Sequence, residues 1–430
     1  MNMPTDSLHH RVARNRTGTD FGSELRFLRR RLIATLSDLR GSLELTDPLG
    51  TVMLGRSQAD DPIGPIRLRV DDPEFYRRVA FSGSVGAGES YMDGHWRCDD
   101  LVGLVRLLVR NRELLDAMES GPARIGSALL KAWHALRRNS IGGSRRNIAA
   151  HYDLGNDLFA AFLDATMMYS SALFEQPGQT LEQAQFNKLE RICRQLELGP
   201  DDRVVEIGTG WGGFAIHAAG RFGCHVVSTT ISHEQHTLAR QRVQAAGLSE
   251  RVTLLLDDYR VLEGQFDKLV SIEMIEAVGH HYLETYLRQC GRLLQPNGLA
   301  LIQAITIEDR RYHKALREVD FIKRHIFPGS FIPSVSAIVS AAARASDLRL
   351  VDLLDIGPSY ALTLNHWRRR FLAQREALRT LGYDPRFARM WEFYLCYCEG
   401  GFIERSISTA QMLFARPGNR RRELSGGVSA

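Results

Sequence analysis

Hydrophobic and polar positions follow a regular alternation in the second half of the chain. Short apolar runs are separated by segments whose apolar residues recur at helical spacing, and the runs cover 203–207, 225–230, 252–258, 266–273 and 298–307. Such alternation predicts a parallel sheet with helices on both faces and ligands at the carboxyl ends of its strands. Functional residues are therefore expected at the strand ends, in 206–213, 229–232, 257–259, 273–279 and 303–306.

The pattern changes after residue 309. A helical insertion punctuated by Pro328, Gly329 and Pro333 is followed by the strand-like run 348–356, by helices near 367–378 and 387–398, and by a last strand at 406–416. This order predicts that an antiparallel pair of strands completes the sheet.

The region 22–122 has a mixed pattern that predicts a smaller α+β domain. It contains helical spacing at 25–39 and 101–115, strand-like runs at 41–45 and 65–70, and glycines at 83, 86 and 88 that are typical of turns. Residues 1–21 and 417–430 are basic and are expected to be disordered, while 123–147 have the composition of a basic linker. The remaining segment, 148–416, then forms the second domain.

Charge and cysteine content restrict the function classes. The net charge is +5, and arginine supplies most of the positive side. The six cysteines lack paired metal-ligand spacing, so neither a metal site nor a disulfide framework is predicted, and we expect a cytoplasmic protein. No apolar run has membrane-spanning length. Any membrane contact of the basic segments is therefore expected to be peripheral, and no nucleic-acid partner is expected.

A glycine turn between a strand and a helix is the strongest local signal for a cofactor. Gly208, Gly210, Gly212 and Gly213 follow the run 203–207, and such a turn lets backbone amides approach a ligand closely. The glycines also satisfy the dinucleotide pattern, which by itself is weak.

The neighbouring residues discriminate between two cofactors. A nicotinamide enzyme needs an acidic residue for the ribose about 20 residues after the glycines, where this chain has Thr229 and Thr230. An acid instead precedes the turn, at Glu206, and Asp257 and Asp258 end a later strand where they could receive an adenine amine. These features favour S-adenosylmethionine over NAD.

The chain resembles the cyclopropane-fatty-acyl-phospholipid synthases, a family that includes mycolic acid cyclopropane synthases and fatty-acid methyltransferases. The resemblance covers nearly all of 22–416, including GESYMDGHW in the first domain, and rests on HYDLGNDLF, MMYSSALF, VVEIGTGWGGFAIHAA, SIEMIEAVG, FIKRHIFPGSFIPS and CEGGFIERSISTAQMLFAR. It implies a class I methyltransferase fold of the Rossmann-like type with a smaller N-terminal domain that docks on lipid. The implied reaction transfers the methyl group of S-adenosylmethionine to a cis double bond of a phospholipid acyl chain and closes a cyclopropane ring.

The resemblance also implies individual site residues. For the cofactor they are Tyr169, Ser170, Glu206, Gly208, Gly210, Gly212, Gly213, Thr230, Ile231, Gln235, Asp258 and Tyr259. In the family a bicarbonate ion serves as the base, and its ligand positions fall here on Glu276, Tyr360, Ser171, Gln303 and Ile305. Ser171 and Gln303 stand where the family has cysteine and histidine, so bicarbonate binding is an open question.

Alternatives follow from these departures. The cation formed by methyl transfer could instead give a methylene branch, or a methyl branch after later reduction. Aromatic faces could stabilise that cation, and the candidates are Tyr169, Phe174, Phe327, Tyr360 and Trp391. An NAD-dependent oxidoreductase and a non-catalytic lipid-binding protein are the remaining hypotheses. We expect peripheral association with the inner face of the membrane, and a homodimer is possible.

Overall fold

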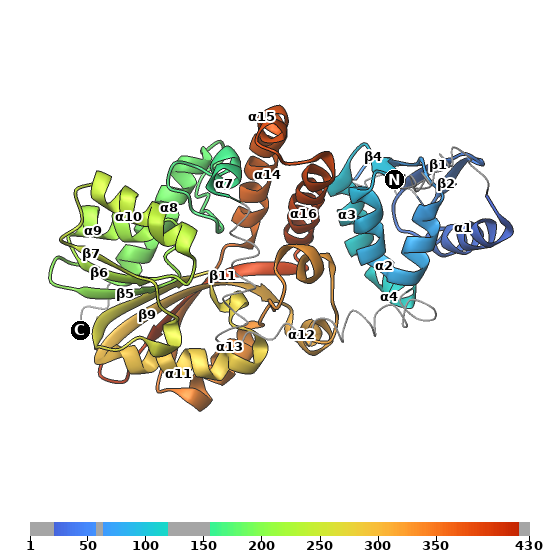
Figure 1. Cartoon of the computed structure of the whole chain (residues 1–430). Helices are drawn as coiled ribbons and strands as arrows, with labels where there is room; N and C mark the ends of the chain where they lie inside the picture. Colours follow the sequence, from blue (N-terminus) through green and yellow to red (C-terminus); the bar gives the residue numbers. More distant parts are fainter. Residues whose placement is uncertain (1–20, 57–62, 119–154, 421–430) are drawn as a thin grey trace, which may run out of the picture.

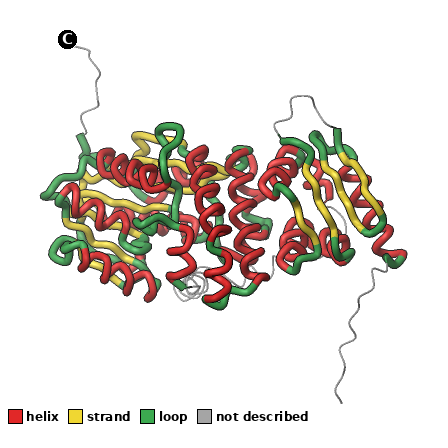
Figure 2. Tube along the Cα trace, turned by 90° about the horizontal axis from the view of Figure 1, so that it is seen from above, coloured by secondary structure: helices red, strands yellow, loops and turns green. Residues whose placement is uncertain are grey.

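The structure is a computed structural model, and it describes residues 21–56, 63–118 and 155–420. An N-terminal unit and a larger sheet-based unit lie at the two ends of the molecule, with a layer of helices between them (Figures 1 and 2). The expected basic linker 123–147 and the expected disordered N-terminus, apart from Phe21, lie outside the described residues.

The N-terminal unit is built on a small mixed sheet with the strand order β2-β1-β3-β4. Its strands are β1 (Leu43–Asp47), β2 (Gly50–Leu54), β3 (Ile66–Val70) and β4 (Trp96–Cys98). In β3 buried and exposed residues alternate strictly, as expected for a sheet with one covered face. The helices are α1 (Ser23–Leu36), α2 (Glu74–Met92), α3 (Leu101–Arg110) and α4 (Arg112–Met118).

One prediction for this unit was wrong. The glycines at 83, 86 and 88 do not form a loop but lie within α2, which is interrupted at Gly83, where φ is 54° and ψ is −132°. Gly86 and Gly88 are buried within the helix. A Cβ atom on Gly88 would overlap the Phe321 ring, so close packing requires glycine here despite its low helix propensity.

The larger unit contains a seven-stranded sheet of order β10-β11-β9-β8-β5-β6-β7. Strands β5 (Arg203–Ile207), β6 (His225–Thr229), β7 (Val252–Leu255), β8 (Phe266–Ile272) and β9 (Leu294–Ile307) are parallel, and β11 (Ile407–Ala415) pairs antiparallel with both β9 and β10 (Arg349–Asp355). The predicted class I methyltransferase sheet, completed by an antiparallel pair, is confirmed.

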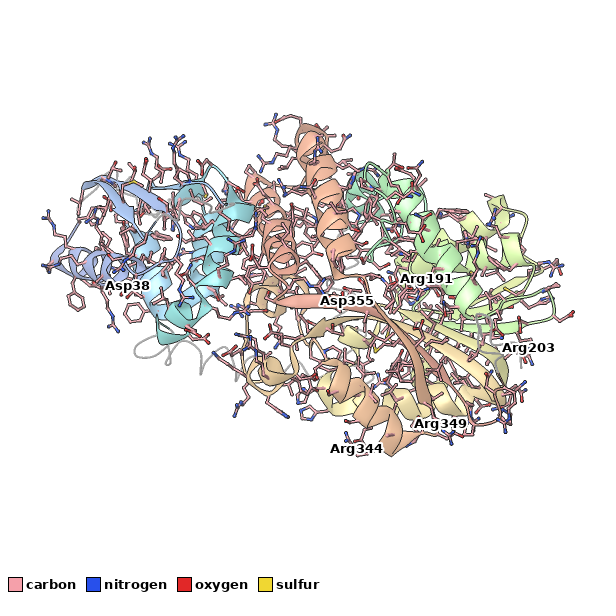
Figure 3. All side chains as sticks on the ribbon, turned by 180° about the vertical axis from the view of Figure 1, so that it is seen from behind. Asp38, Arg191, Arg203, Arg344, Arg349 and Asp355 are labelled. Carbon is pink, nitrogen blue, oxygen red and sulfur yellow. The ribbon has the colours of Figure 1, made fainter. Side chains whose placement is uncertain are left out.

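Helices cover both faces of this sheet (Figure 1). They are α8 (Leu181–Gln195), α9 (Gly213–Phe222), α10 (His233–Ala245), α11 (Leu283–Leu293) and α13 (Val335–Ala345). Two shorter helices lie beside them, α7 (Asn156–Phe162) against α14 (Gly357–Ala373) and α12 (Asp309–Ala315) against α13. Short 3-10 turns cover Tyr259–Val261, Ile275–Ala277 and His280–Tyr282, and a π-helical turn covers Ile322–Ile326. Charged side chains such as Arg203, Arg344 and Arg349 lie on the outside (Figure 3).

Two long helices join the units. They are α14 (Gly357–Ala373) and α16 (Pro385–Ile403), separated by the short α15 (Arg375–Thr380), and α16 packs against α2 and α3. One cluster of buried apolar residues continues from the N-terminal sheet through α16 to α7. Across the same boundary Arg106 and Arg110 both contact Glu404, at 2.8 and 2.7 Å. The N-terminal unit is therefore packed against the helical layer that contains α16.

The last described residues of the chain are ordered against the larger sheet. Residues 417–420, expected to belong to a disordered tail, are held against the start of β9, where Gly418 N–H donates to Pro296 O at 2.9 Å. Among the described residues, every helix is too short or too polar to cross a bilayer.

Candidate functional site

A cavity of about 880 Å³ connects the two units of the fold. At one end its wall consists of the carboxyl ends of β5, β6 and β8 and the segment after β7, and at the other it consists of buried apolar residues of the N-terminal unit. The N-terminal wall includes Leu36, Leu43, Leu68, Val85 and Leu104. Small-molecule sites commonly have volumes of about 300–1,000 Å³, so the cavity is large for one compact ligand.

The glycine turn has the geometry that a closely bound cofactor requires. Gly212 has φ 83°, a left-handed conformation that disfavours other residues, and it caps the N-terminus of α9. A Cβ atom on Gly213 would lie 2.6 Å from Met168 Sδ and 2.8 Å from Thr166 O. Gly208 and Gly210 line the cavity, whereas Gly212 and Gly213 are not part of its wall.

Glu206 is the second-last residue of β5 and lies just before this turn. It is 3% exposed, lines the cavity, and accepts a hydrogen bond from Ser228 Oγ at 2.6 Å. Burial raises the pKa of its carboxyl to about 8, and the Ser228 bond opposes that shift. A cationic ligand in the cavity would stabilise the ionised carboxylate, because an opposite charge favours the charged form.

The neighbouring strand ends supply polar groups to the same cavity. Thr230 Oγ1 donates to Gln235 Oε1 at 2.8 Å, and Ile231 lies between them in the wall. Asp258 and Tyr259 also line the cavity, but the Asp258 carboxylate forms a two-point ion pair with Arg260, at 2.8 and 2.7 Å. Arg260 therefore competes for the carboxylate oxygens that the adenine assignment would use.

Glu273 stands at the end of β8 in the centre of a hydrogen-bond network. Its Oε1 atom accepts from Ser171 N–H at 2.9 Å and from Gln303 Nε2 at 2.8 Å, and its Oε2 atom accepts from Tyr360 Oη at 2.8 Å. Its φ of 50° is a left-handed conformation that costs a non-glycine residue roughly 1–2 kcal/mol. Strain of this kind at a cavity wall is typical of functional positions.

Three of the predicted anion-binding residues, Ser171, Gln303 and Tyr360, donate to Glu273, whereas Ile305 donates to Glu276. Ser171 and Gln303 are fully buried and do not line the cavity, whereas Glu273 does. The Ser171 hydroxyl donates to Ala172 O at 3.0 Å, and Gln303 Nε2 also donates to Ser171 O at 3.3 Å. The carboxylate of Glu273 therefore stands between these two residues and the cavity.

Glu276 lies one turn further along the same loop. Its Oε1 atom accepts from Ile305 N–H at 2.5 Å, and its Oε2 atom is buried without a hydrogen-bond partner. Burial raises the pKa of Glu276 to about 8, and the nearby charge of Glu273 adds to the increase. Burial also raises the pKa of Glu273, but the bonds from Gln303 and Ser171 and the charge of Lys188 oppose it. These bonds and the charge of Lys188 therefore favour the ionised form of Glu273 more than any group favours that of Glu276.

Lys188 supplies a buried positive charge to the part of the site around Glu273. Its side chain is fully buried on α8, and its Nζ atom donates to Ser170 Oγ at 2.8 Å. Burial lowers the pKa of Lys188 to about 8, while the charge of Glu273 acts in the opposite direction. Buried cations are costly unless compensated, so Lys188 and Glu273 stabilise each other's charge.

The aromatic candidates separate into two groups. Tyr169, Phe327 and Tyr360 line the cavity, and Tyr169 Oη is hydrogen-bonded to Tyr394 Oη at 2.8 Å. Phe174 stacks on His366, and Trp391 is fully buried in the interface, so both belong to the packing.

These residues fit S-adenosylmethionine. The turn excludes a Cβ at Gly213, Glu206 offers a buried carboxylate to a cation, and the end of β6 carries Thr229, whose hydroxyl donates to Asp257 O, rather than an acid for a nicotinamide ribose. They do not fit bicarbonate in the predicted way, because a carboxylate of the protein already takes up the donors. Among the described residues there is no group of His, Cys, Asp and Glu side chains that could hold a metal ion.

Sequence reasoning did not single out Glu273 and Lys188. Glu273 was contained in the expected strand-end range 273–279 and in the motif SIEMIEAVG, but its role depends on partners from three other segments. Lys188 lies on a helix with no motif, and only its complete burial distinguishes it.

Comparisons with known proteins agree on one family. The model of the family "Mycolic acid cyclopropane synthetase" matches residues 140–412. The chain is 42% identical over 369 residues to the tuberculostearic acid methyltransferase UfaA1 of Mycobacterium tuberculosis, covering 84% of this chain and 85% of that one. It is 39% identical over 378 residues to the cyclopropane-fatty-acyl-phospholipid synthase of Escherichia coli K12, covering 87% and 92%.

Solved structures agree with this family and with the fold. The mycolic acid cyclopropane synthase CmaA1, in a complex with SAH and CTAB, superimposes with a TM-score of 0.59 at 28% identity, covering 63% of this chain and 98% of that chain. Coclaurine N-methyltransferase, at 17% identity and a TM-score of 0.59, shares the fold. Together with the cavity and the glycine turn, these findings show that the chain belongs to the family of cyclopropane-fatty-acyl-phospholipid synthases and mycolic acid cyclopropane synthases, and that it is an S-adenosylmethionine-dependent methyltransferase.

Proposed function

We propose that this enzyme transfers the methyl group of S-adenosylmethionine to the cis double bond of an acyl chain in a membrane phospholipid and closes a cyclopropane ring. The coarser activity, methyl or methylene transfer to a fatty-acyl chain, is that of the family. The observation that carries the proposal is the cavity that joins the glycine turn to an apolar chamber in the N-terminal unit.

The chamber supports an acyl chain as the substrate. Its lining within the N-terminal unit is mostly apolar, with Leu36, Leu43, Leu68, Phe75 and Trp96 from the core of that unit. A hydrocarbon chain gains roughly 0.8 kcal/mol for each CH₂ group removed from water, which favours its entry into such a space. A double bond near the middle of the chain could then lie beside the glycine turn.

S-adenosylmethionine, when bound, supplies a methyl group on a cationic sulfur that an alkene can attack. The glycine turn and Glu206 would hold it, with Thr230, Gln235 and Tyr259 around it. The apolar walls formed by Phe327 and Ile305 exclude water, which would otherwise trap a carbocation. The faces of Tyr169 and Tyr360 in the same wall can stabilise positive charge. Glu273 and Glu276 are the groups at hand to hold a proton.

A second product is supported by a specific finding. The relative at 42% identity is named for tuberculostearic acid, so a methylene-branched acyl chain, or a methyl-branched one after later reduction, is the alternative. Both products require loss of a proton from the substrate cation after the same methyl transfer. The alternative therefore shares the cofactor site, the chamber and the carboxylates with the main proposal.

We further propose that α1 brings the enzyme to an anionic bilayer. Arg26, Phe27, Arg30 and Arg31 are all exposed on this helix, which lies at the end of the molecule remote from the catalytic sheet (Figure 1). Exposed arginines favour anionic lipid, and an aromatic residue between them can enter the interfacial region. High salt should weaken this contact, and salt-independent pelleting with anionic vesicles would contradict it.

The proposed activity is tested by incubating the purified protein with S-adenosylmethionine and vesicles of a cis-monounsaturated phospholipid. Mass spectrometry of the acyl chains should show a gain of one CH₂ unit. Catalytic hydrogenation then separates the products, because a methylene branch takes up hydrogen under conditions in which a cyclopropane does not. Vesicles of a saturated phospholipid are the matched control, and equal labelling of both lipids would contradict the proposal.

A further inference from the structure

The positions that the family resemblance assigns to bicarbonate lie around a carboxylate that belongs to the chain itself. Ser171 N–H and Gln303 Nε2 both donate to Glu273 Oε1, and Tyr360 Oη donates to Oε2. A bound carbonate-type anion would need donors of this kind, because it presents only oxygen atoms that accept. The donors are present, and Glu273 already accepts from them.

Access to the cavity gives the same conclusion. Ser171 and Gln303 are fully buried and do not reach the cavity wall, whereas Glu273 forms part of that wall. An ion entering from the cavity would therefore meet the Glu273 carboxylate before it met either donor. It would also meet a second carboxyl group at Glu276. The Glu273 carboxylate repels an anion at such short range, so this corner disfavours an additional one.

The surroundings hold the Glu273 carboxylate in place and stabilise its charge. Its backbone N–H donates to Gln303 O at 2.8 Å, and the left-handed φ directs the chain away from the strand at this residue. Lys188 is the buried cation whose charge is coupled to it. The backbone, three hydrogen bonds and a compensating cation thus all fix the position of this glutamate. Structural packing alone would not require so many interactions.

We propose that the Glu273 carboxylate takes the place of bicarbonate in this enzyme and accepts the proton that the substrate loses after methyl transfer. A C–H bond of the carbon supplied by the methyl donor breaks. The C–H electron pair forms the new C–C bond of a ring with the neighbouring cationic carbon. For a methylene branch, a 1,2-hydride shift first moves the cation to the carbon that bears the new methyl group, and the C–H electron pair then forms the double bond. In both cases the proton goes to Glu273. The positive charge of the substrate cation and the negative charge of the carboxylate cancel in this step. The inference rests on the proposed transfer to an acyl double bond.

The enzyme should then work without dissolved bicarbonate. Turnover of the full-length wild-type protein in carbon-dioxide-free buffer should change less than about twofold when sodium bicarbonate is added. The variant Glu273→Gln should lose turnover by at least about 100-fold, as expected for removal of a general base, while its affinity for S-adenosylmethionine stays within about threefold. The exposed Glu284, paired with Arg344, provides a matched control through Glu284→Gln, which should behave as the wild type.

Removing the carboxylate should create the anion site that wild type lacks. In Glu273→Gly, formate or bicarbonate should restore turnover at least about tenfold above that of the variant alone. Titration with ¹³C-labelled bicarbonate should broaden the carbon resonance saturably with Glu273→Gly but not with the wild type.

Two results would overturn the inference. One is a wild-type enzyme whose turnover collapses when bicarbonate is removed, and the other is a Glu273→Gln variant that remains active. If wild type forms no lipid product at all, the proposed function fails instead. The ¹³C titration still decides the present question in that case, because saturable bicarbonate binding to wild type would refute it without any turnover.

Discussion

Replacing Glu206 by glutamine should stabilise the protein without cofactor while weakening the cofactor site. Glu206 is 3% exposed at the end of β5, and Ser228 Oγ donates to it at 2.6 Å. Burial raises its pKa to about 8, well above the value of 4.5 for an unperturbed glutamate. An ionisable group in such a position makes folding depend on pH.

The sign and size of the effect follow from this pKa. A carboxyl whose pKa is raised by folding contributes its full stability below pH 4.5, and that contribution is lost as the pH rises through about 8. At pH 7 the unfolded chain is ionised at this residue and the folded chain is mostly protonated, which costs up to about 3 kcal/mol. At pH 5 the same difference is below about 1 kcal/mol. Glutamine has nearly the same shape but does not ionise, so the variant lacks this pH-dependent cost.

Urea unfolding at pH 5 and pH 8 in the absence of cofactor measures the difference. The unfolding midpoint of Glu206→Gln should exceed that of wild type at pH 8 and approach it at pH 5. Calorimetric titration should at the same time show weaker binding of S-adenosylmethionine, because the carboxylate opposite the cationic cofactor is lost. The exposed Glu182, which pairs with Arg370, is the control, and Glu182→Gln should show no stabilisation at pH 8. A Glu206→Gln variant that is destabilised equally at both pH values would refute the reasoning.

Other perturbations test the turn, the interface between the units and the cysteines. Gly213→Ala should abolish cofactor binding in equilibrium dialysis, because the new Cβ would lie 2.6 Å from Met168 Sδ; unchanged affinity would contradict the assigned turn. Glu404→Gln should lower the free energy of unfolding by about 1–2 kcal/mol in chemical denaturation, since two partly buried arginines lose their partner; no change would show that the packing alone holds the units together. Burial raises the pKa of all six cysteine thiols, so an alkylating reagent at pH 8 should label them only after unfolding, and rapid labelling of the folded protein would contradict this.

The sequence predicted the sheet correctly, because its strands depend on local patterns. Each strand of the larger sheet appears as a short apolar run, and parallel strands place their carboxyl ends at one edge whatever the helices between them do. For this reason Glu206, Thr230 and Tyr259, which follow different strands, could be assigned to one cavity.

The sequence could not predict contacts that depend on several distant segments. Glu273 acquires its role from Ser171, Gln303 and Tyr360, which come from a loop, a strand and a helix that only the folded chain brings together. The family resemblance assigned these partners to a bound bicarbonate ion. It also assigned the glutamate of that site to Glu276 rather than to Glu273. The sequence also could not predict the N-terminal wall of the cavity, because its leucines have the same spacing as other buried residues.

Helix α2 shows a different limit. Glycines at 83, 86 and 88 indicate turns by local propensity, yet two of them are buried within a helix that packs against α16. Tertiary packing can override propensity of about 1 kcal/mol per glycine, and only the partner helix reveals that it does so here.

The central claim is that the methyl carbon of S-adenosylmethionine is transferred to the middle of a lipid acyl chain. It is tested most directly by ¹³C NMR of phospholipid recovered after reaction with S-adenosylmethionine labelled in its methyl group. We predict one labelled carbon attached to the acyl chain at the former double bond, at a cyclopropane or branch position. Label in the lipid head group, or no label in lipid while S-adenosylmethionine is consumed, would contradict the account.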